Sequence, residues 1–140
     1  MKVIIDANRV IASMIKEGTT REILFDSMFE FSAPDNIMSE IRKHEKRVTE
    51  AAQLTKEEFE VLLILIFENI KIIPKADYQA FMEENKSKIK DPEDLPYIAV
   101  CLATGSEGIW THDPHFKEQK IVETFTNIDM LRKAGKVKAD

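Results

Sequence analysis

The stretch KVIIDANRVIASMIKEG, residues 2–18, decides the fold class, because a strand pattern passes directly into a helix pattern. Three consecutive aliphatic residues, 3–5, have no polar residue between them, which is typical of a strand buried on both faces. After Asp6 the chain changes to apolar residues at helical spacing: Val10, Ile11, Met14 and Ile15. Gly18 is a C-cap candidate for this helix. The stretch therefore predicts the first strand and helix of an α/β domain.

The alternation continues along the chain. We expect further extended segments at FSAP (31–34), NIKIIP (69–74), GIWT (108–111) and VETFT (122–126). We expect one helix to begin at a capping box, Thr19–Glu22, with Ile23, Leu24, Phe25 and Met28 facing inward, and another to follow a second capping box at Thr55–Glu58. We expect further helices over 36–48, over 77–89, from Asp91 to Gly105 and over 127–135. No linker, repeat or low-complexity tract interrupts the pattern. Residues 1–140 are thus predicted to form one domain, a three-layer α/β/α sandwich with a central parallel, Rossmann-like sheet.

Composition narrows the class of protein. With 140 residues and 44% hydrophobic content, the chain is long enough to bury a core. Its longest apolar run, VLLILIF at 61–67, is too short to cross a bilayer, and no signal peptide is apparent. The single cysteine, Cys101, lies in an apolar helical pattern, which favours a core thiol and a reducing, cytoplasmic location. Because the net charge is −5, binding to a polyanion would require local screening of the acids.

Acidic residues occur where strands end. Asp6 closes the first strand, and Asp113 lies just past GIWT. Asp94 stands in the first turn of the helix before GIWT, and Glu40 lies one turn into the helix after FSAP. Because sites in open parallel sheets form outside the carboxyl ends of the strands, all four side chains are expected to face one edge of the sheet.

Each of these acids also has a purely structural interpretation. Asp94 could favour a helix N-terminus, Glu40 could be a solvated surface residue, and Asp6 and Asp113 could form turns. The four together favour a site. Clustered carboxylates repel one another unless cations lie between them, and hard divalent ions such as Mg²⁺ or Mn²⁺ prefer oxygen ligands. Such ions promote in-line attack on phosphodiesters.

The ordered set of segments DANRVIA (6–12), SEI (39–41), DLPYIAVCLATG (94–105) and THDPHF (111–116) resembles the PIN domain family. This is a metal-dependent ribonuclease fold that includes the toxins of bacterial and archaeal toxin–antitoxin pairs. The resemblance implies a catalytic quartet of Asp6, Glu40, Asp94 and Asp113, with Asp6, Asp94 and Asp113 as metal ligands. It also implies supporting roles for Asn8 and Thr111.

Several neighbouring residues compete with these assignments. Asp91 and Glu93 lie close to Asp94, which is preferred because its spacing to Tyr97-Ile98-Ala99 is that of the family. His112 could bind a metal or donate a proton, although a solvent-facing turn histidine is favoured. The three histidines show no zinc spacing. Phe116 is expected to anchor the turn after GIWT on the core.

Two segments are candidates for contact with partners. The run RKHEKR (42–47) begins two residues after Glu40, so its cations Arg42, Lys43, Lys46 and Arg47 are the first choice for contacting RNA; a solvated helix face with internal ion pairs is the alternative. Other positive charge lies in KSKIK (86–90), at Lys117 and Lys120, and between Arg132 and Lys138. VLLILIF is either sandwiched in the core or exposed at a subunit contact, and we expect a homodimer.

The resemblance predicts a Mg²⁺- or Mn²⁺-dependent endoribonuclease acting on RNA, and the bare domain favours a toxin with a small antitoxin partner. The alternatives are an RNA-maturation nuclease and a catalytically silent PIN-like module that binds RNA or protein. A receiver-type signalling domain also places acids at strand ends, but the late strand ends in Thr-His-Asp and lacks the lysine which that class requires.

Overall fold

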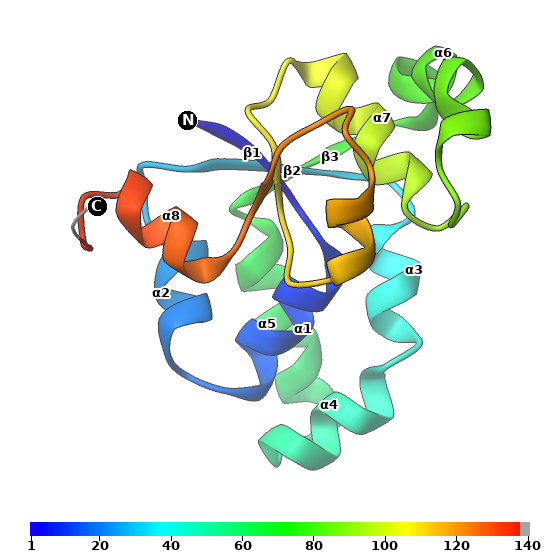
Figure 1. The fold of residues 1–140 in the computed structure, drawn as a ribbon. Helices are drawn as coiled ribbons and strands as arrows, with labels where there is room; N and C mark the ends of the chain where they lie inside the picture. Colours follow the sequence, from blue (N-terminus) through cyan, green and yellow to red (C-terminus); the bar gives the residue numbers. More distant parts are fainter. Residues whose placement is uncertain (138–140) are drawn as a thin grey trace.

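A computed structural model describes residues 1–137 and contains a five-stranded, entirely parallel sheet (Figure 1). The strand order is β3-β2-β1-β4-β5. The strands are β1 (Lys2–Ile5), β2 (Glu30–Pro34), β3 (Ile70–Ile73), β4 (Ile109–Trp110) and β5 (Thr124–Phe125). β1 is central, and its register with β4 pairs Ile5 with Trp110. The residues that follow β1 and β4 therefore leave the sheet side by side.

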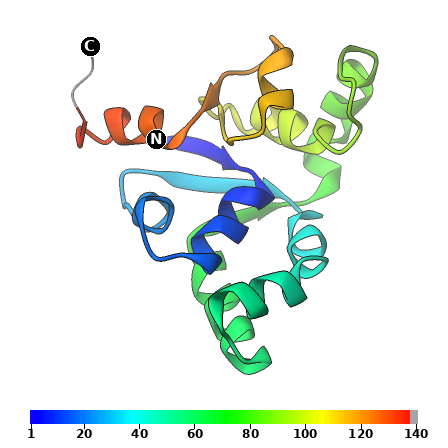
Figure 2. The same ribbon diagram turned by 60° about the horizontal axis from the view of Figure 1, so that its bottom comes forward.

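Helices cover both faces of this sheet. They are α1 (Ala7–Ile15), α2 (Thr19–Leu24), α3 (Ile37–Arg42), α4 (Glu45–Ala52), α5 (Lys56–Phe67), α6 (Lys75–Asn85), α7 (Leu95–Thr104) and α8 (Asn127–Lys133), with short 3-10 turns η1 (Lys86–Lys88) and η2 (Pro114–Glu118). Helix α7 packs on β1, β2 and β4, and α6 packs on α7. Figure 2 shows α1, α4 and α5 on the opposite side of the sheet. The expected three-layer sandwich is confirmed.

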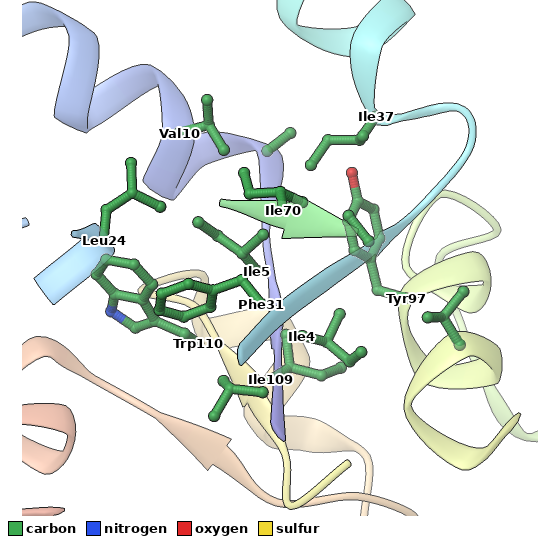
Figure 3. Packing of buried hydrophobic residues seen from close by; sticks show 14 of the residues in the cluster. Ile4, Ile5, Val10, Leu24, Phe31, Ile37, Ile70, Tyr97, Ile109 and Trp110 are labelled. Carbon is green, nitrogen blue, oxygen red and sulfur yellow. The ribbon is translucent and has the colours of Figure 1, made fainter. Parts of the chain in front are cut away.

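The core forms where the layers meet, as Figure 3 shows. Val3, Ile4 and Ile5 of β1 are completely buried, as a strand between two helical layers requires. On one face, the rings of Phe31 and Trp110 stack with centroids 5.4 Å apart. These contacts fix the carboxyl end of β4 against β1, which is where the acidic residues begin.

The second half of the core is organised around α7. Tyr97 of α7 is buried, and its ring meets Phe116 edge-on with centroids 6.1 Å apart. Phe116 therefore anchors the turn after β4 on the core, as expected. Cys101 is a buried free thiol, also as expected, and burial raises its pKa to about 12. A thiol in this environment is unreactive.

The predicted capping box at Thr19 is wrong. Thr19 lies inside α2, Gly18 occupies the cap position without a side-chain bond, and the carboxylate of Glu22 lies 3.0 Å from the ammonium of Lys136. Because α2 ends at Leu24, Phe25 and Met28 leave its buried face and are exposed, contrary to expectation.

Three other boundaries differ from the predictions. Gly18 does not cap α1, which ends at Ile15 because Lys16 is extended. The helix expected over 36–48 is divided, since the backbone at His44 departs from helical geometry and α4 turns toward α1. The helix expected over 77–89 stops at Asn85 and passes into η1. By contrast, the capping box at Thr55–Glu58 is present in full.

Candidate active site at the carboxyl ends of β1 and β4

Asp6 is the centre of the acidic site. It follows β1, caps α1 and is only 5% exposed. One carboxylate oxygen accepts a hydrogen bond from the hydroxyl of Thr111 at 2.7 Å, and the other accepts from the backbone N–H of Asn8 at 3.4 Å. Burial raises the pKa of Asp6, and Asp113 adds to the rise, whereas the two hydrogen bonds oppose it. The fold thus holds a carboxylate where its ionised form is poorly solvated.

Thr111 connects Asp6 to Asp113. Its hydroxyl oxygen accepts the backbone N–H of Asp113 at 3.0 Å while donating to Asp6. The backbone N–H of Asp6 donates to the carbonyl of Trp110 at 3.2 Å, which ties the two strand ends together. Asp6 and Asp113 therefore share one edge of the sheet, as the strand pattern predicts. Thr111 bonds to both residues, and its supporting role stays a prediction.

Asp113 caps the η2 turn. Its carboxylate accepts the backbone N–H of His115 at 2.9 Å, and the imidazole Nδ1 of His115 lies 3.3 Å from the same oxygen. His112 and His115 are both exposed, but the Nε2 of His112 accepts the backbone N–H of Asn127 at 3.0 Å. Of the two histidines in THDPHF, His115 is therefore the one beside the acids. The sequence offered no reason to prefer it.

Asp94 joins the same electrostatic cluster from the face covered by α7. It occupies the N-cap position of α7 without a capping hydrogen bond from its side chain, and it is nearly buried. Burial raises the pKa of Asp94 to about 7, and the charges of Asp91, Asp113 and Asp6 contribute to the rise. Asp91 is partly exposed and accepts the backbone N–H of Glu93 at 2.9 Å, a turn-forming bond. These environments favour Asp94 over Asp91 as the functional residue, and the assignment stays a prediction.

Glu40 approaches the cluster from α3. It is partly buried, and its carboxylate accepts the side-chain N–H of Asn36 at 3.1 Å. Burial raises the pKa of Glu40, and the charges of Asp6 and Glu93 raise it further. The carboxyl groups of the quartet therefore influence one another's pKa values, although the elements that carry them, α3, α7, β1 and β4, are far apart in sequence.

Two residues near the acids were not singled out by the sequence. The hydroxyl of Tyr97 is buried, has no hydrogen-bond partner within 3.5 Å among residues 1–137, and lies near enough to Glu40 to lower the pKa of that carboxyl as a donor; burial and the charges of Glu40 and Asp6 raise the pKa of Tyr97. Arg9 is partly buried, and its charge lowers the pKa of Asp6. Both lie three residues after an acid, Asp94 or Asp6, one helical turn along. That spacing is the signal that could have identified them.

Asn8 contributes differently from the expectation. Its side chain is exposed, and only its backbone N–H contacts Asp6. The supporting role expected for its side chain therefore stays a prediction, whereas its amide is part of the cap of α1.

The donor set at this edge suits a hard cation. It consists of carboxylate oxygens from four elements, with the hydroxyl of Thr111 holding one of them. Within residues 1–137, however, no three acidic, histidine or cysteine side chains already converge as a complete set of metal ligands. The chemistry of the donors thus fits a divalent ion, and binding one requires side-chain rearrangement.

The cations of RKHEKR are divided in their roles. Arg42 is engaged by Glu60 of α5, with its two terminal nitrogens 2.6 and 3.1 Å from the carboxylate oxygens. It also lies 3.8 Å from Glu45, so one internal ion pair of the alternative interpretation is present in the run. Lys43, Lys46 and Arg47 are exposed and form no ion pair within residues 1–137. Lys43 also lies close enough to Glu40 to lower its pKa. RNA contact by this run stays a prediction.

A family model described as the PIN domain matches residues 4–130, which is most of the chain. The chain belongs to the PIN domain family. No curated protein matches it. PIN domains are generally nucleases that act on RNA and use divalent metals, so the family supports a hydrolase here. None of the helices in residues 1–137 of this PIN domain is long and apolar enough to span a membrane.

Proposed function

We propose that this PIN domain is a Mg²⁺- or Mn²⁺-dependent endoribonuclease that hydrolyses RNA phosphodiester bonds beside Asp6. The proposal depends on one observation: Asp6 is buried, held by Thr111, and electrostatically coupled to Asp94, Asp113 and Glu40. Clustered buried carboxylates destabilise a fold unless they serve a ligand, and a divalent cation is the ligand that their oxygens suit.

Asp6, Asp94 and Asp113 are the proposed metal-holding residues. Thr111 would position Asp6 through its 2.7 Å hydrogen bond and, at the same time, fix the backbone of Asp113. When bound, Mg²⁺ or Mn²⁺ would supply the positive charge that screens the acids and polarises the scissile phosphate. An acidic protein could then accept a polyanionic substrate at this edge.

Glu40 is the proposed residue that orients the attacking water and accepts its proton. Its pKa is raised by burial, which brings its basicity closer to neutral pH, where proton transfer is most efficient. Its carboxylate is oriented by the side chain of Asn36 at 3.1 Å. The buried hydroxyl of Tyr97, which lies near the charges of Glu40 and Asp6, could donate a hydrogen bond when Glu40 is ionised.

The toxin of a toxin–antitoxin pair is the proposed biological setting, with action in the cytoplasm and a homodimer as the working form. The unpaired thiol of Cys101 agrees with a reducing compartment. Val61, Ile64 and Leu65 of α5, here named the α5 stripe, are 57, 63 and 47% exposed and support contact with another chain. A groove of about 660 Å³ beside α1 shares Val61 and Leu65 with the stripe and could take an antitoxin segment.

A catalytically silent PIN-like module is the second candidate. It is favoured by the finding that no three ligand side chains within residues 1–137 converge in advance. An RNA-maturation nuclease would share the proposed site and differ from a toxin in lacking a neighbouring antitoxin gene.

The deciding experiment is cleavage of single-stranded RNA with Mn²⁺. We expect the wild type to cut, and EDTA or an Asn or Gln substitution of any quartet acid to abolish cutting. Asp91→Asn is the matched control for Asp94→Asn. A wild type that binds RNA without cutting it under any divalent ion would support the silent module, and loss of activity in Asp91→Asn alone would move the ligand to that residue.

A further inference from the structure

A cleft of about 430 Å³ opens beside Asp94, between the segment that follows α6 and the η2 turn. Its volume lies within the range of roughly 300–1,000 Å³ typical of small-molecule sites. Ile89, Pro92 and Ile98 supply apolar surface, and Asp94 forms part of its wall. The cleft is therefore continuous with the acidic site and large enough to hold one monomer unit of a polymeric substrate.

Two lysines without an ion-pair partner among the described residues line this cleft. Lys88 and Lys90 are exposed, and within residues 1–137 neither forms an ion pair, whereas their neighbour Lys86 lies 2.8 Å from the carboxylate of Glu83. The imidazole of His115 lines the cleft from η2. Since an ammonium with no carboxylate partner is free to bind phosphate, the two lysines mark where an anionic backbone would pass.

The other polar residues of the cleft determine what it could hold inside. Asp91 and Glu118 are carboxylates, so they repel phosphate and leave the interior to a neutral group such as a base and its ribose. Gln119 is fully occupied: its amide nitrogen donates to the carbonyls of Phe116 and Val122, both at 2.8 Å, and its oxygen accepts two backbone N–H groups. Gln119 thus has no free group with which to read a base edge.

We infer that this cleft binds one nucleotide of a single-stranded RNA next to the scissile phosphate, with its phosphates on Lys88 and Lys90 and its base against Ile89, Pro92 and Ile98. This inference rests on the proposed ribonuclease function and places the substrate strand along KSKIK, in addition to RKHEKR.

The test compares two double variants of equal charge change. Lys88→Ala/Lys90→Ala removes the cleft cations, and Lys16→Ala/Lys56→Ala removes two exposed lysines from the far end of α1 and the start of α5. Binding of fluorescein-labelled single-stranded RNA is measured by anisotropy in EDTA at several salt concentrations. Cleavage of the same RNA with Mn²⁺ then gives KM and kcat.

We expect the cleft variant to raise Kd about tenfold, and to reduce the slope of log Kd against log salt by about 1.4, or ~0.7 for each lost phosphate contact. KM should rise in parallel with little change in kcat, and the control variant should match the wild type. Equal Kd and slope in the two double variants, or no RNA binding by the wild type, would overturn the inference.

The outcomes separate this inference from the proposed function. If the wild type cuts RNA and the cleft variant binds RNA normally, the cleft assignment fails and the nuclease stands. If binding depends on the cleft lysines and no cleavage occurs with any divalent ion, the nuclease fails and the cleft stands.

Discussion

The acidic edge of the sheet and the α5 stripe depart from ordinary burial in opposite directions. At the edge, the charged side chains of Asp6 and Asp94 are buried, 5 and 9% exposed; on α5, the apolar side chain of Ile64 is 63% exposed. Both arrangements cost free energy in an isolated chain. The edge is built from segments far apart in sequence, whereas the stripe lies on one helix. The comparison agrees with the two partners proposed above, a cation for the first region and a protein surface for the second.

The largest effect is expected from Asp6→Asn, which should lower RNA cleavage at least about a hundredfold. Stability should change little, because burial opposes the charge of Asp6, whereas the single amide oxygen can keep only one of its two hydrogen bonds, that from Thr111 or that from the backbone N–H of Asn8. Cleavage assays and thermal unfolding measure the two quantities.

Asp35→Asn is the matched control at the end of the neighbouring strand. Asp35 accepts the hydroxyl of Tyr78 at 2.7 Å and the backbone N–H of Lys75 at 3.0 Å, which are structural contacts. Its substitution should cost about 1 kcal/mol of stability and leave cleavage intact. An Asp6→Asn variant as active as Asp35→Asn would remove the functional meaning of the acidic edge.

Thr111→Val tests whether the buried carboxylate is positioned for a cation. Losing the 2.7 Å bond to Asp6 should weaken the affinity for Mn²⁺ about 10- to 100-fold, as measured by titration calorimetry. Thr111→Ser keeps the hydroxyl and should restore the affinity. Equal Mn²⁺ affinity in the Val and Ser variants would show that the hydroxyl serves folding alone.

Ile64→Lys tests the other side of the comparison. If the α5 stripe packs against a second copy, placing an ammonium there should weaken the dimer about 10- to 100-fold, as measured by sedimentation or light scattering against concentration. Ile128→Lys, on α8, is the control, because Ile128 is also exposed, at 48%. A wild type that stays monomeric at high concentration would leave the stripe to a different partner.

A further prediction concerns pH and stability in EDTA. The pKa of Asp94 is about 7 in the fold, above its ordinary value of 3.8, so the folded protein binds this proton more tightly than the unfolded chain. The contribution to the free energy of unfolding is therefore complete below about pH 4 and is lost as pH rises to about 7, by at most ~1.4 kcal/mol per pH unit.

Asp94→Asn should reduce this pH dependence, leaving the part that comes from the raised pKa values of Asp6 and Glu40, and Asp77→Asn, an exposed acid on α6, should leave it unchanged. Denaturant unfolding between pH 4 and 8 measures the slope. Stabilisation by Mn²⁺ should be larger at pH 8 than at pH 6, because a ligand must be deprotonated to bind the metal. A slope that is unchanged in Asp94→Asn would assign the proton to another residue.

The sequence by itself determined the layer architecture and the edge at which the acids lie. Val3–Ile5 and GIWT had the pattern of buried strands, and parallel strands place their carboxyl ends at one edge, so Asp6 and Asp113 were expected at the same edge of the sheet. The capping box formed by Thr55 and Glu58 could also be predicted from the sequence, because its two residues are only three positions apart.

Only the tertiary structure decided which neighbours each side chain meets. Glu22 lies 3.0 Å from Lys136, and Arg42 forms an ion pair with Glu60; in both pairs the partners are far apart in sequence. Likewise, the packing of α7 against η2 and α3 creates the cleft beside Asp94 and buries the hydroxyl of Tyr97. Local patterns reflect backbone and solvent preferences, whereas long-range packing determines burial, pKa and charge pairing.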